Sequence, residues 1–210
     1  MKKITVFLNA VMAGVCIGIG GAAFLSIENK VVGALFFTVG LFVIVTFGYN
    51  LYTGKVCYVF DNKPSYLLDV ALIWLGNLAG TAAVGYALRA TRVSSVAERA
   101  ADMCEAKLSD GLLSIFILSL FCNMLIFIAV DGFKNNQHQV GKYLSLFLGV
   151  AVFILCGFEH CVANMFYFSV ANVWSLRTLG YLAVMTVGNA VGGWIMPLAR
   201  RAVTAMSKGE

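Results

Sequence analysis

Six long apolar segments, separated by short polar connections, constrain this chain of 210 residues more than any other feature. A helix rises about 1.5 Å per residue, so roughly 20 apolar residues cross the hydrocarbon core of a bilayer. Helices satisfy their own backbone in lipid, and segments of this length favour them. We therefore predict an all-α integral membrane protein with six transmembrane helices, at about 4–27, 31–60, 66–89, 110–133, 142–171 and 176–199.

The composition favours a membrane protein over a water-soluble one. Hydrophobic residues make up 60% of the chain and charged residues only 12%, whereas a soluble domain has about 25% charged residues. The length predicts a single transmembrane domain, residues 1–210. The net charge of +5 comes without an aromatic-basic motif, so we expect no nucleic-acid partner. The first residues mimic a signal peptide, but their apolar stretch runs to Ser26 and suits a first spanning helix better.

Six spans place both termini on one side of the membrane, and the loop charges predict which side. The cations on the side of the termini are Lys2, Lys3, Lys63, Lys134, Lys142, Arg200, Arg201 and Lys208. Fewer cations fall on the other side: Lys30, Arg89, Arg92, Arg99, Lys107 and Arg177. Cytoplasmic loops carry the excess of Lys and Arg. We therefore predict a multi-pass protein of the cell (inner) membrane with both termini in the cytoplasm.

Two of the apolar segments are too long for one straight crossing, and both contain glycine and polar residues near their middle. The second segment contains FGYNLYTGK at 47–55, and the fifth contains CGFEHC at 156–161. Paired interruptions of this kind are typical of transporters and channels built from inverted repeats. Half-helices that start at such interruptions point their positive ends inward and attract small anions.

A second sign of an internal repeat is a Gly-Asn motif that follows each interruption, LGNLAGT at 75–81 and VGNAVGG at 187–193. We therefore predict an inverted 3+3 repeat with helices 2 and 5 interrupted. Its halves are about 1–89 and 110–199. They are joined by a polar linker at 90–109, on the outer side, with room for an amphipathic helix of its own.

The strings that carry a family resemblance are GFEHCVANMF at 157–166, NLYTGK at 50–55, FCNMLIFIAV at 121–130 and the two Gly-Asn motifs. Together they resemble the formate/nitrite transporter family over residues of about 5–199, and the first string is the most specific. The resemblance implies an aquaporin-like fold that assembles as a homopentamer, with one pore in each protomer. It also implies transport of small monovalent anions of weak acids, and it leaves formate, nitrite and hydrosulfide open as substrates.

The resemblance also implies roles for individual residues. It assigns these residues to the substrate pore: His160, Thr53, Lys107, Asn164, Phe37, Leu41, Leu51 and Phe153. Among them His160 is the central pore histidine and Lys107 the vestibule lysine. The two phenylalanines form an outer apolar constriction and the two leucines an inner one. A polar network that holds the interrupted helices comprises Glu159, Asn50, Asn123 and Asn189.

Four positions depart from the family pattern. Asn50 stands where an acidic residue or glutamine is usual, and Cys156 and Cys161 stand where serine is frequent. Lys55 follows the first interruption at a position where a neutral residue is common. These departures bear on the choice of substrate rather than on transport itself.

The residues at the second interruption also admit other interpretations. Cys156 and His160 are four residues apart, but two ligands make no closed metal site, so we expect neither a metal nor a cofactor. Adjacent helix residues point about 100° apart, so Glu159 and His160 do not predict an enzyme. We expect Glu159 to cap backbone N–H groups freed at the interruption. The alternative functions are an aquaporin-like neutral-solute channel and a membrane-embedded acid–base enzyme. The paired N-P-A signature expected of an aquaporin is missing from this sequence.

An anion that crosses an apolar passage must lose its water, at a cost on the order of 20 kcal/mol by continuum estimates. Lys107 and the positive helix ends would concentrate anions at the vestibule. His160 would then donate a hydrogen bond or a proton, and a protonated weak acid crosses apolar contacts at lower cost. We expect the flux to rise as the pH falls. A passive channel and a proton-coupled carrier both fit this scaffold.

Overall fold

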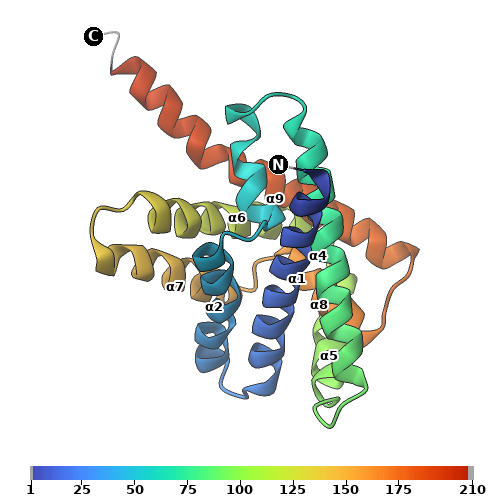
Figure 1. Cartoon of the computed structure of the whole chain (residues 1–210). Helices are drawn as coiled ribbons and strands as arrows, with labels where there is room; N and C mark the ends of the chain where they lie inside the picture. Colours follow the sequence, from blue (N-terminus) through green and yellow to red (C-terminus); the bar gives the residue numbers. More distant parts are fainter. Residues whose placement is uncertain (1, 208–210) are drawn as a thin grey trace.

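The computed structural model describes residues 2–207, and these residues form helices and connecting turns without a strand (Figure 1). Lys208, one of the cations counted above, lies outside the described residues. The elements in chain order are α1 (Lys3–Ser26), α2 (Lys30–Phe47), α3 (Tyr52–Lys55), the 3-10 helix η1 (Val56–Asp61), α4 (Tyr66–Arg89), α5 (Val96–Ser109), α6 (Leu112–Asn135), α7 (Gln139–Leu155), α8 (Cys161–Ala171) and α9 (Leu176–Met206).

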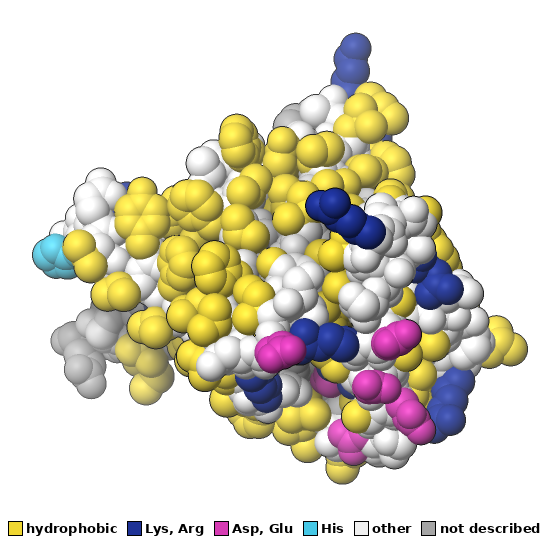
Figure 2. Space-filling view, turned by 90° about the horizontal axis from the view of Figure 1, so that it is seen from below, with side chains coloured by type: hydrophobic (Ala, Val, Ile, Leu, Met, Phe, Trp, Pro, Cys, Tyr) yellow, Lys and Arg dark blue, Asp and Glu magenta, His cyan; other side chains and the backbone are white. Residues whose placement is uncertain are grey.

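Five of these helices, α1, α2, α4, α6 and α9, are long and apolar enough to cross a membrane, with mean hydropathies between 1.4 and 2.6. The helices α7 and α8 are shorter and also apolar. Large apolar side chains lie on the outside, such as Leu113 at 73% exposure, and they cover much of the face in Figure 2. A broad exposed apolar surface is typical of contact with lipid or another subunit. The predictions of an all-α chain with several apolar helices are confirmed.

The last helix extends beyond its predicted end. The apolar segment was expected to stop at residue 199, but α9 continues to Met206. The Arg200 guanidinium donates to the Asp131 carboxylate of α6 at 2.8 Å, and Arg201 pairs with Asp61 of η1. These contacts hold the polar end of α9 against two neighbouring elements, so the helix continues beyond the end of the apolar segment.

Both of the longest predicted segments are divided in the structure. Residues 48–51 separate α2 from α3, and residues 156–160 separate α7 from α8. Gly48 and Gly157 have φ angles of 71° and 70°, a left-handed conformation that glycine adopts without the usual steric cost. The two glycines are 109 residues apart (157 − 48 = 109), and so are the starts of α3 and α8 (161 − 52 = 109).

The helix pairs α1–α4 and α6–α9 cross closely in the same way. A Cβ at Gly80 of α4 would collide with the Val11 carbonyl oxygen of α1. A Cβ at Gly192 of α9 would collide with the Leu120 carbonyl oxygen of α6. Val11 and Leu120 are again 109 residues apart (120 − 11 = 109). Small residues at such crossings let helix backbones approach each other in lipid.

Helix α8 lies at the centre of the molecule, and each of its residues from Cys161 to Val170 is buried. It packs against α4, α5, α1 and α9. The polar linker does contain a helix, α5, whose Arg99 donates to the Leu25 and Ile27 carbonyls at the end of α1. These bonds supply partners for carbonyls that the end of a helix leaves free.

Candidate functional site

His160 and Thr53 meet where the two interruptions face each other. His160 is the N-cap residue of α8, and its Nδ1 accepts a hydrogen bond from the Ala163 backbone N–H at 3.0 Å. Its Nε2 lies 2.9 Å from the Thr53 hydroxyl oxygen, and both side chains are buried. Because Nδ1 accepts, the ring proton of neutral His160 resides on Nε2 and is donated to Thr53. The structure therefore presents a neutral imidazole with its N–H directed across the gap between the half-helices.

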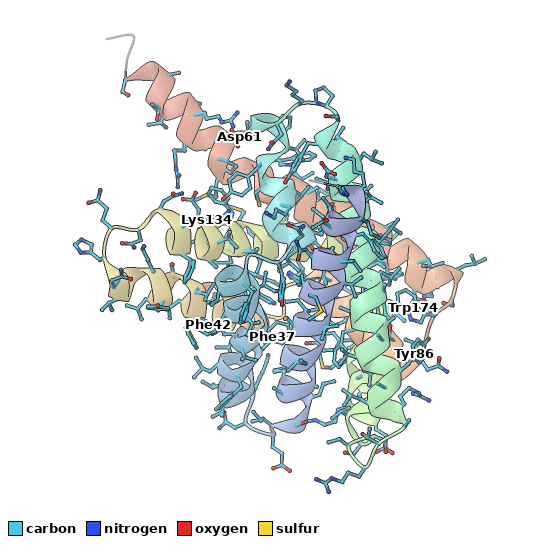
Figure 3. All side chains as sticks on the ribbon, viewed as in Figure 1. Phe37, Phe42, Asp61, Tyr86, Lys134 and Trp174 are labelled. Carbon is cyan, nitrogen blue, oxygen red and sulfur yellow. The ribbon has the colours of Figure 1, made fainter. Side chains whose placement is uncertain are left out.

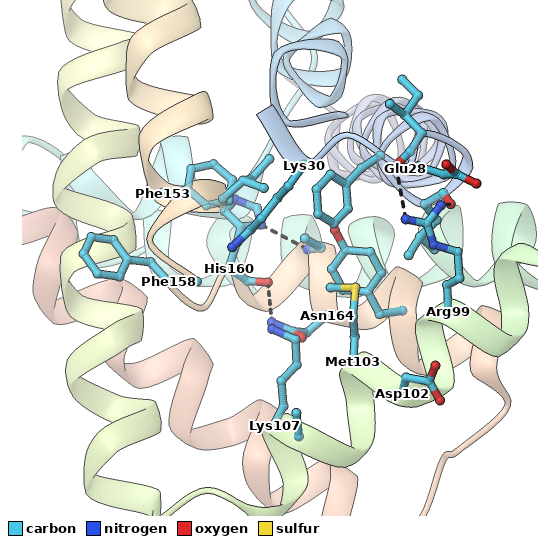
Figure 4. Close-up of a pocket in the computed structure, with 18 residues that line it drawn as sticks. Glu28, Lys30, Arg99, Asp102, Met103, Lys107, Phe153, Phe158, His160 and Asn164 are labelled. Carbon is cyan, nitrogen blue, oxygen red and sulfur yellow. Dashed lines mark hydrogen bonds between the residues drawn. The ribbon is translucent and has the colours of Figure 1, made fainter. Parts of the chain in front are cut away.

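The predicted cap role of Glu159 is wrong. Its two carboxylate oxygens accept from the Lys107 ammonium at 2.7 and 2.6 Å, and one also accepts from the Asn164 amide at 2.8 Å. Side-chain exposure is 14% for Lys107 and 5% for Glu159, so the pair is largely removed from water. A buried carboxylate needs a charged partner more than it needs a peptide N–H. The capping acceptor at α8 is instead the imidazole of His160 (Figure 4).

Asn189 holds the second interruption with its whole side-chain amide. Its Oδ1 accepts from the Cys161 backbone N–H, the first of α8, at 2.8 Å. Its Nδ2 donates to the Ser119 carbonyl of α6 at 2.7 Å and to the Glu159 carbonyl at 2.8 Å. One buried side chain therefore satisfies two backbone groups at the interruption, the Cys161 N–H and the Glu159 carbonyl, and ties them to the Ser119 carbonyl of α6.

Asn77 holds the first interruption with the same set of bonds. Its Oδ1 accepts from the Tyr52 backbone N–H, the first of α3, at 2.8 Å. Its Nδ2 donates to the Ala10 carbonyl of α1 at 2.8 Å and to the Asn50 carbonyl at 2.9 Å. Asn77 was not among the residues predicted for the polar network, although the shared Gly-Asn motif was the signal that could have found it. We refer to Asn77 and Asn189 as the two amide clamps.

Asn50 and Asn123 of the predicted network and Asn164 of the predicted pore are also buried. The Asn50 amide donates to the Val6 carbonyl at 3.3 Å. The Asn123 amide donates to the Thr53 carbonyl at 3.1 Å and to the Asn189 carbonyl at 2.7 Å, so it joins the two halves. Besides its bond to Glu159, the Asn164 amide donates to the His160 carbonyl at 3.0 Å. Asn123 and Asn164 thus bind the backbone carbonyls of Thr53 and His160, and Asn50 ties the first interruption to α1.

The residues of the predicted apolar constrictions fall into two separate clusters. The Phe37 and Phe153 rings meet edge to face with centroids 6.0 Å apart, and Phe37 lies inside the bundle in Figure 3. Phe153 stacks on the His160 ring at 5.6 Å. Leu41 and Leu51 are 1% and 2% exposed, and both line a different cavity from the one that His160 lines.

Two cavities lie at opposite ends of α2. The larger, about 580 Å³, is lined by His160, Phe153, Asn164 and Lys107 (Figure 4) and includes Lys30 at the start of α2. The smaller, about 80 Å³, is lined by residues near the end of α2 and by both leucines. The predicted pore residues thus lie in or between these cavities. Among the described residues, no group of three or more His, Cys, Asp or Glu side chains could hold a metal ion.

A model of the formate/nitrite transporter family matches residues 1–200. The chain belongs to this family. It is a multi-pass membrane protein, as the family and the apolar helices indicate. The family match agrees with the resemblance seen in the sequence.

Relatives within the formate/nitrite transporter family include channels and transporters from bacteria. The formate channel FocB of Escherichia coli (strain K12) is 27% identical over 187 residues, which are 79% of this chain and 66% of FocB. The formate channel FocA of Haemophilus influenzae (strain ATCC 51907 / DSM 11121 / KW20 / Rd) is 24% identical over 90% of this chain and 82% of its own length. The aligned part thus spans just under two thirds of FocB.

Solved structures of the same family share the fold over almost the whole chain. A pentameric formate channel with formate bound matches with a TM-score of 0.85 and 25% identity, covering 97% of this chain and 98% of that one. An FNT family ion channel matches with a TM-score of 0.82 and 22% identity, covering 96% and 91%. The helical arrangement is therefore that of the family.

Proposed function

We propose that this chain is a membrane channel for small monovalent anions of weak acids, with formate as the leading substrate and nitrite and hydrosulfide in the same class. The channel names of FocB and FocA support formate, and so does the solved pentameric channel with formate bound. The observation that carries the proposal is the buried contact between His160 and Thr53, flanked by two apolar clusters and two cavities.

We further propose six membrane crossings arranged as an inverted 3+3 repeat in one domain. In this arrangement α2 with α3 and η1 makes one interrupted crossing, and α7 with α8 makes the other. The repeat halves are about 1–89 and 110–199, with the linker at 90–109. Gly48 and Gly157 are 109 residues apart, and so are the starts of α3 and α8. These matches and the two amide clamps support the proposal.

Passage of an anion past the phenylalanine and leucine pairs requires loss of its water, and the His160–Thr53 pair offers replacement donors. The Nε2–H of neutral His160 can donate to an anion that displaces the Thr53 hydroxyl oxygen, and that hydroxyl can donate in turn. Donation of a proton by a neutral ring would leave an imidazolate. Protonation at Nδ1 would break the cap bond from Ala163. Of the two roles predicted for His160, the geometry therefore favours hydrogen bonding over proton transfer.

Formate flux into liposomes tests the role of His160. A hydrogen bond to a charged group contributes about 1.5–3 kcal/mol, so His160→Ala should lower formate flux roughly tenfold or more. His160→Asn should retain part of the flux, because an amide supplies both a cap acceptor and a donor. His138→Ala is the matched control, since that histidine is exposed in a turn. Unchanged formate flux in both His160 variants would contradict the role.

The orientation and assembly are also proposals. Both described ends of the chain lie toward the same side in Figure 1, and the Lys and Arg count favours the cytoplasmic side of the cell (inner) membrane. The pentameric state of the solved neighbour supports a homopentamer. Chemical cross-linking in membranes should yield a ladder that ends at five protomers, and a ladder that stops at two would contradict this. We propose no enzymatic activity.

A further inference from the structure

The two cavities differ in charge. The larger one is lined by the cations Lys30, Arg99 and Lys107 and by the acids Glu28 and Asp102, and the Lys107 ammonium is neutralised by its ion pair with the Glu159 carboxylate. Its charges therefore balance. The smaller one is lined by Lys55 and Lys134 and by no acidic side chain among the described residues.

Neither lysine of the smaller cavity forms an ion pair within the part of the chain that the structure describes. The Lys134 ammonium lies 5.0 Å from the Tyr58 ring centroid, a contact that leaves its charge in place. The acid in this region, Asp131, accepts from the Arg200 guanidinium and the Asn135 amide, both at 2.8 Å. Its charge is thus already offset, and the two lysine charges remain available.

The walls of the smaller cavity select the kind of anion that can use these charges. Apart from the lysines, the lining includes apolar side chains such as Leu41, Leu51 and Val130, and the volume is about 80 Å³. A bulky or multiply charged anion does not fit a space of this size, whereas a one-carbon carboxylate does. Part of its lining comes from the end of α6, where Figure 3 labels Lys134.

We propose that Lys55 and Lys134 form a second anion-binding site, which holds one small monovalent carboxylate outside the leucine constriction. The inference rests on the proposed transport function and adds that the two membrane faces differ in their affinity for formate. Two unpaired cations raise the local anion concentration at this end of α2, while the balanced charges of the larger cavity do not. The half-saturating formate concentration should therefore be lower at the face that carries Lys55 than at the opposite face.

Two measurements test the site, one of binding and one of flux. Binding of ¹³C-labelled formate to the purified protein is followed by line broadening of the formate signal, at low and at high salt. Initial flux is compared in right-side-out and inside-out membrane vesicles, so that each face is supplied in turn. The variants are Lys55→Met and Lys134→Met, with Lys55→Arg to retain the charge and Lys63→Met as a control. Lys63 is exposed and does not line the cavity.

We expect each methionine variant to raise the half-saturating formate concentration about threefold or more at the face of the smaller cavity. The other face should change less, and Lys55→Arg and Lys63→Met should behave like the unmodified protein. High salt should reduce the difference, because it screens exposed charges. Equal effects at both faces, or binding that is identical in Lys134→Met and Lys63→Met, would overturn the site. Absence of any anion flux in the unmodified protein would refute the proposed function, and the line-broadening experiment would still decide the site.

Discussion

At the scale of single residues, the amide clamps explain how two interrupted helices persist in an apolar environment. Each clamp uses one acceptor and two donors on three backbone groups, all with distances of 2.7–2.9 Å. A buried backbone group without a partner costs about 1–3 kcal/mol. Asparagine is suited to this position because its short side chain carries donor and acceptor on the same planar group.

Removal of either clamp should therefore destabilise the protein by a similar amount. We expect Asn77→Ala and Asn189→Ala each to cost about 3 kcal/mol or more and to lower Tm in detergent by roughly 5–10 °C. Asn172→Gly is the control, because Asn172 is exposed and has a φ of 58°, which glycine also adopts. A loss confined to one of the two clamp variants would contradict their equivalence.

Single residues also mark what sequence could and could not predict at the site. His160 and Thr53 were assigned to the pore by the resemblance to the formate/nitrite transporter family, and the structure brings them to 2.9 Å. The role of Glu159 was misjudged because its partner, Lys107, lies 52 residues away on another helix. That Lys55 and Lys134 line the same cavity was not predicted for the same reason, since spacing in the sequence does not indicate which helix ends lie close together.

At the scale of helices, the close crossings depend on glycine where carbonyl oxygens of the neighbouring helix intrude. A Cβ at Gly192 of α9 would collide with the Leu120 carbonyl oxygen, whereas a Cβ at Gly180 of the same helix would meet no atom within 4 Å. The sequence shows both glycines inside the same apolar segment, 176–199. It could not distinguish a glycine at a crossing from one that faces outward.

Gly192 and Gly180 of α9 should respond oppositely to alanine. Gly192→Ala forces α6 and α9 apart, and we expect a loss of about 1–3 kcal/mol or more, with a fall in the yield of monodisperse protein. Gly180→Ala should be neutral or stabilising by up to about 1 kcal/mol, because alanine has the higher helix propensity. Thermal unfolding of both variants in the same detergent is the measurement. Similar losses in both would contradict a role for the crossing.

Helix ends were less predictable than helix positions. The starts of α4 and α9 coincide with the predicted segments, since a change from polar to apolar residues marks both. The end of α9 was placed seven residues short (206 − 199 = 7), because ion pairs and not hydrophobicity hold its last turns. Contacts between distant charged residues leave no periodic signal in a sequence.

At the scale of the whole molecule, the His160–Thr53 contact, both apolar clusters and both cavities are complete within one chain. Each protomer of an assembly should therefore conduct independently. In assemblies that mix unmodified and His160→Ala protomers, formate flux should fall in direct proportion to the fraction of unmodified protomers. Separately tagged chains, co-expressed in known ratios and reconstituted, provide the measurement. A flux that falls much more steeply than the fraction of unmodified protomers would indicate a pathway shared between protomers.

The amide clamps have a consequence for how the chain is made. All partners of Asn77 precede it in the sequence, and all partners of Asn189 precede it within the second half. A nascent chain that has been released by the ribosome as far as α4 already holds every group needed to close its first interruption. The second interruption closes by the same steps once α9 has entered the bilayer. Synthesis can thus proceed in two successive stages, and the later half then adds the Asn123 donor to the Thr53 carbonyl of the earlier one.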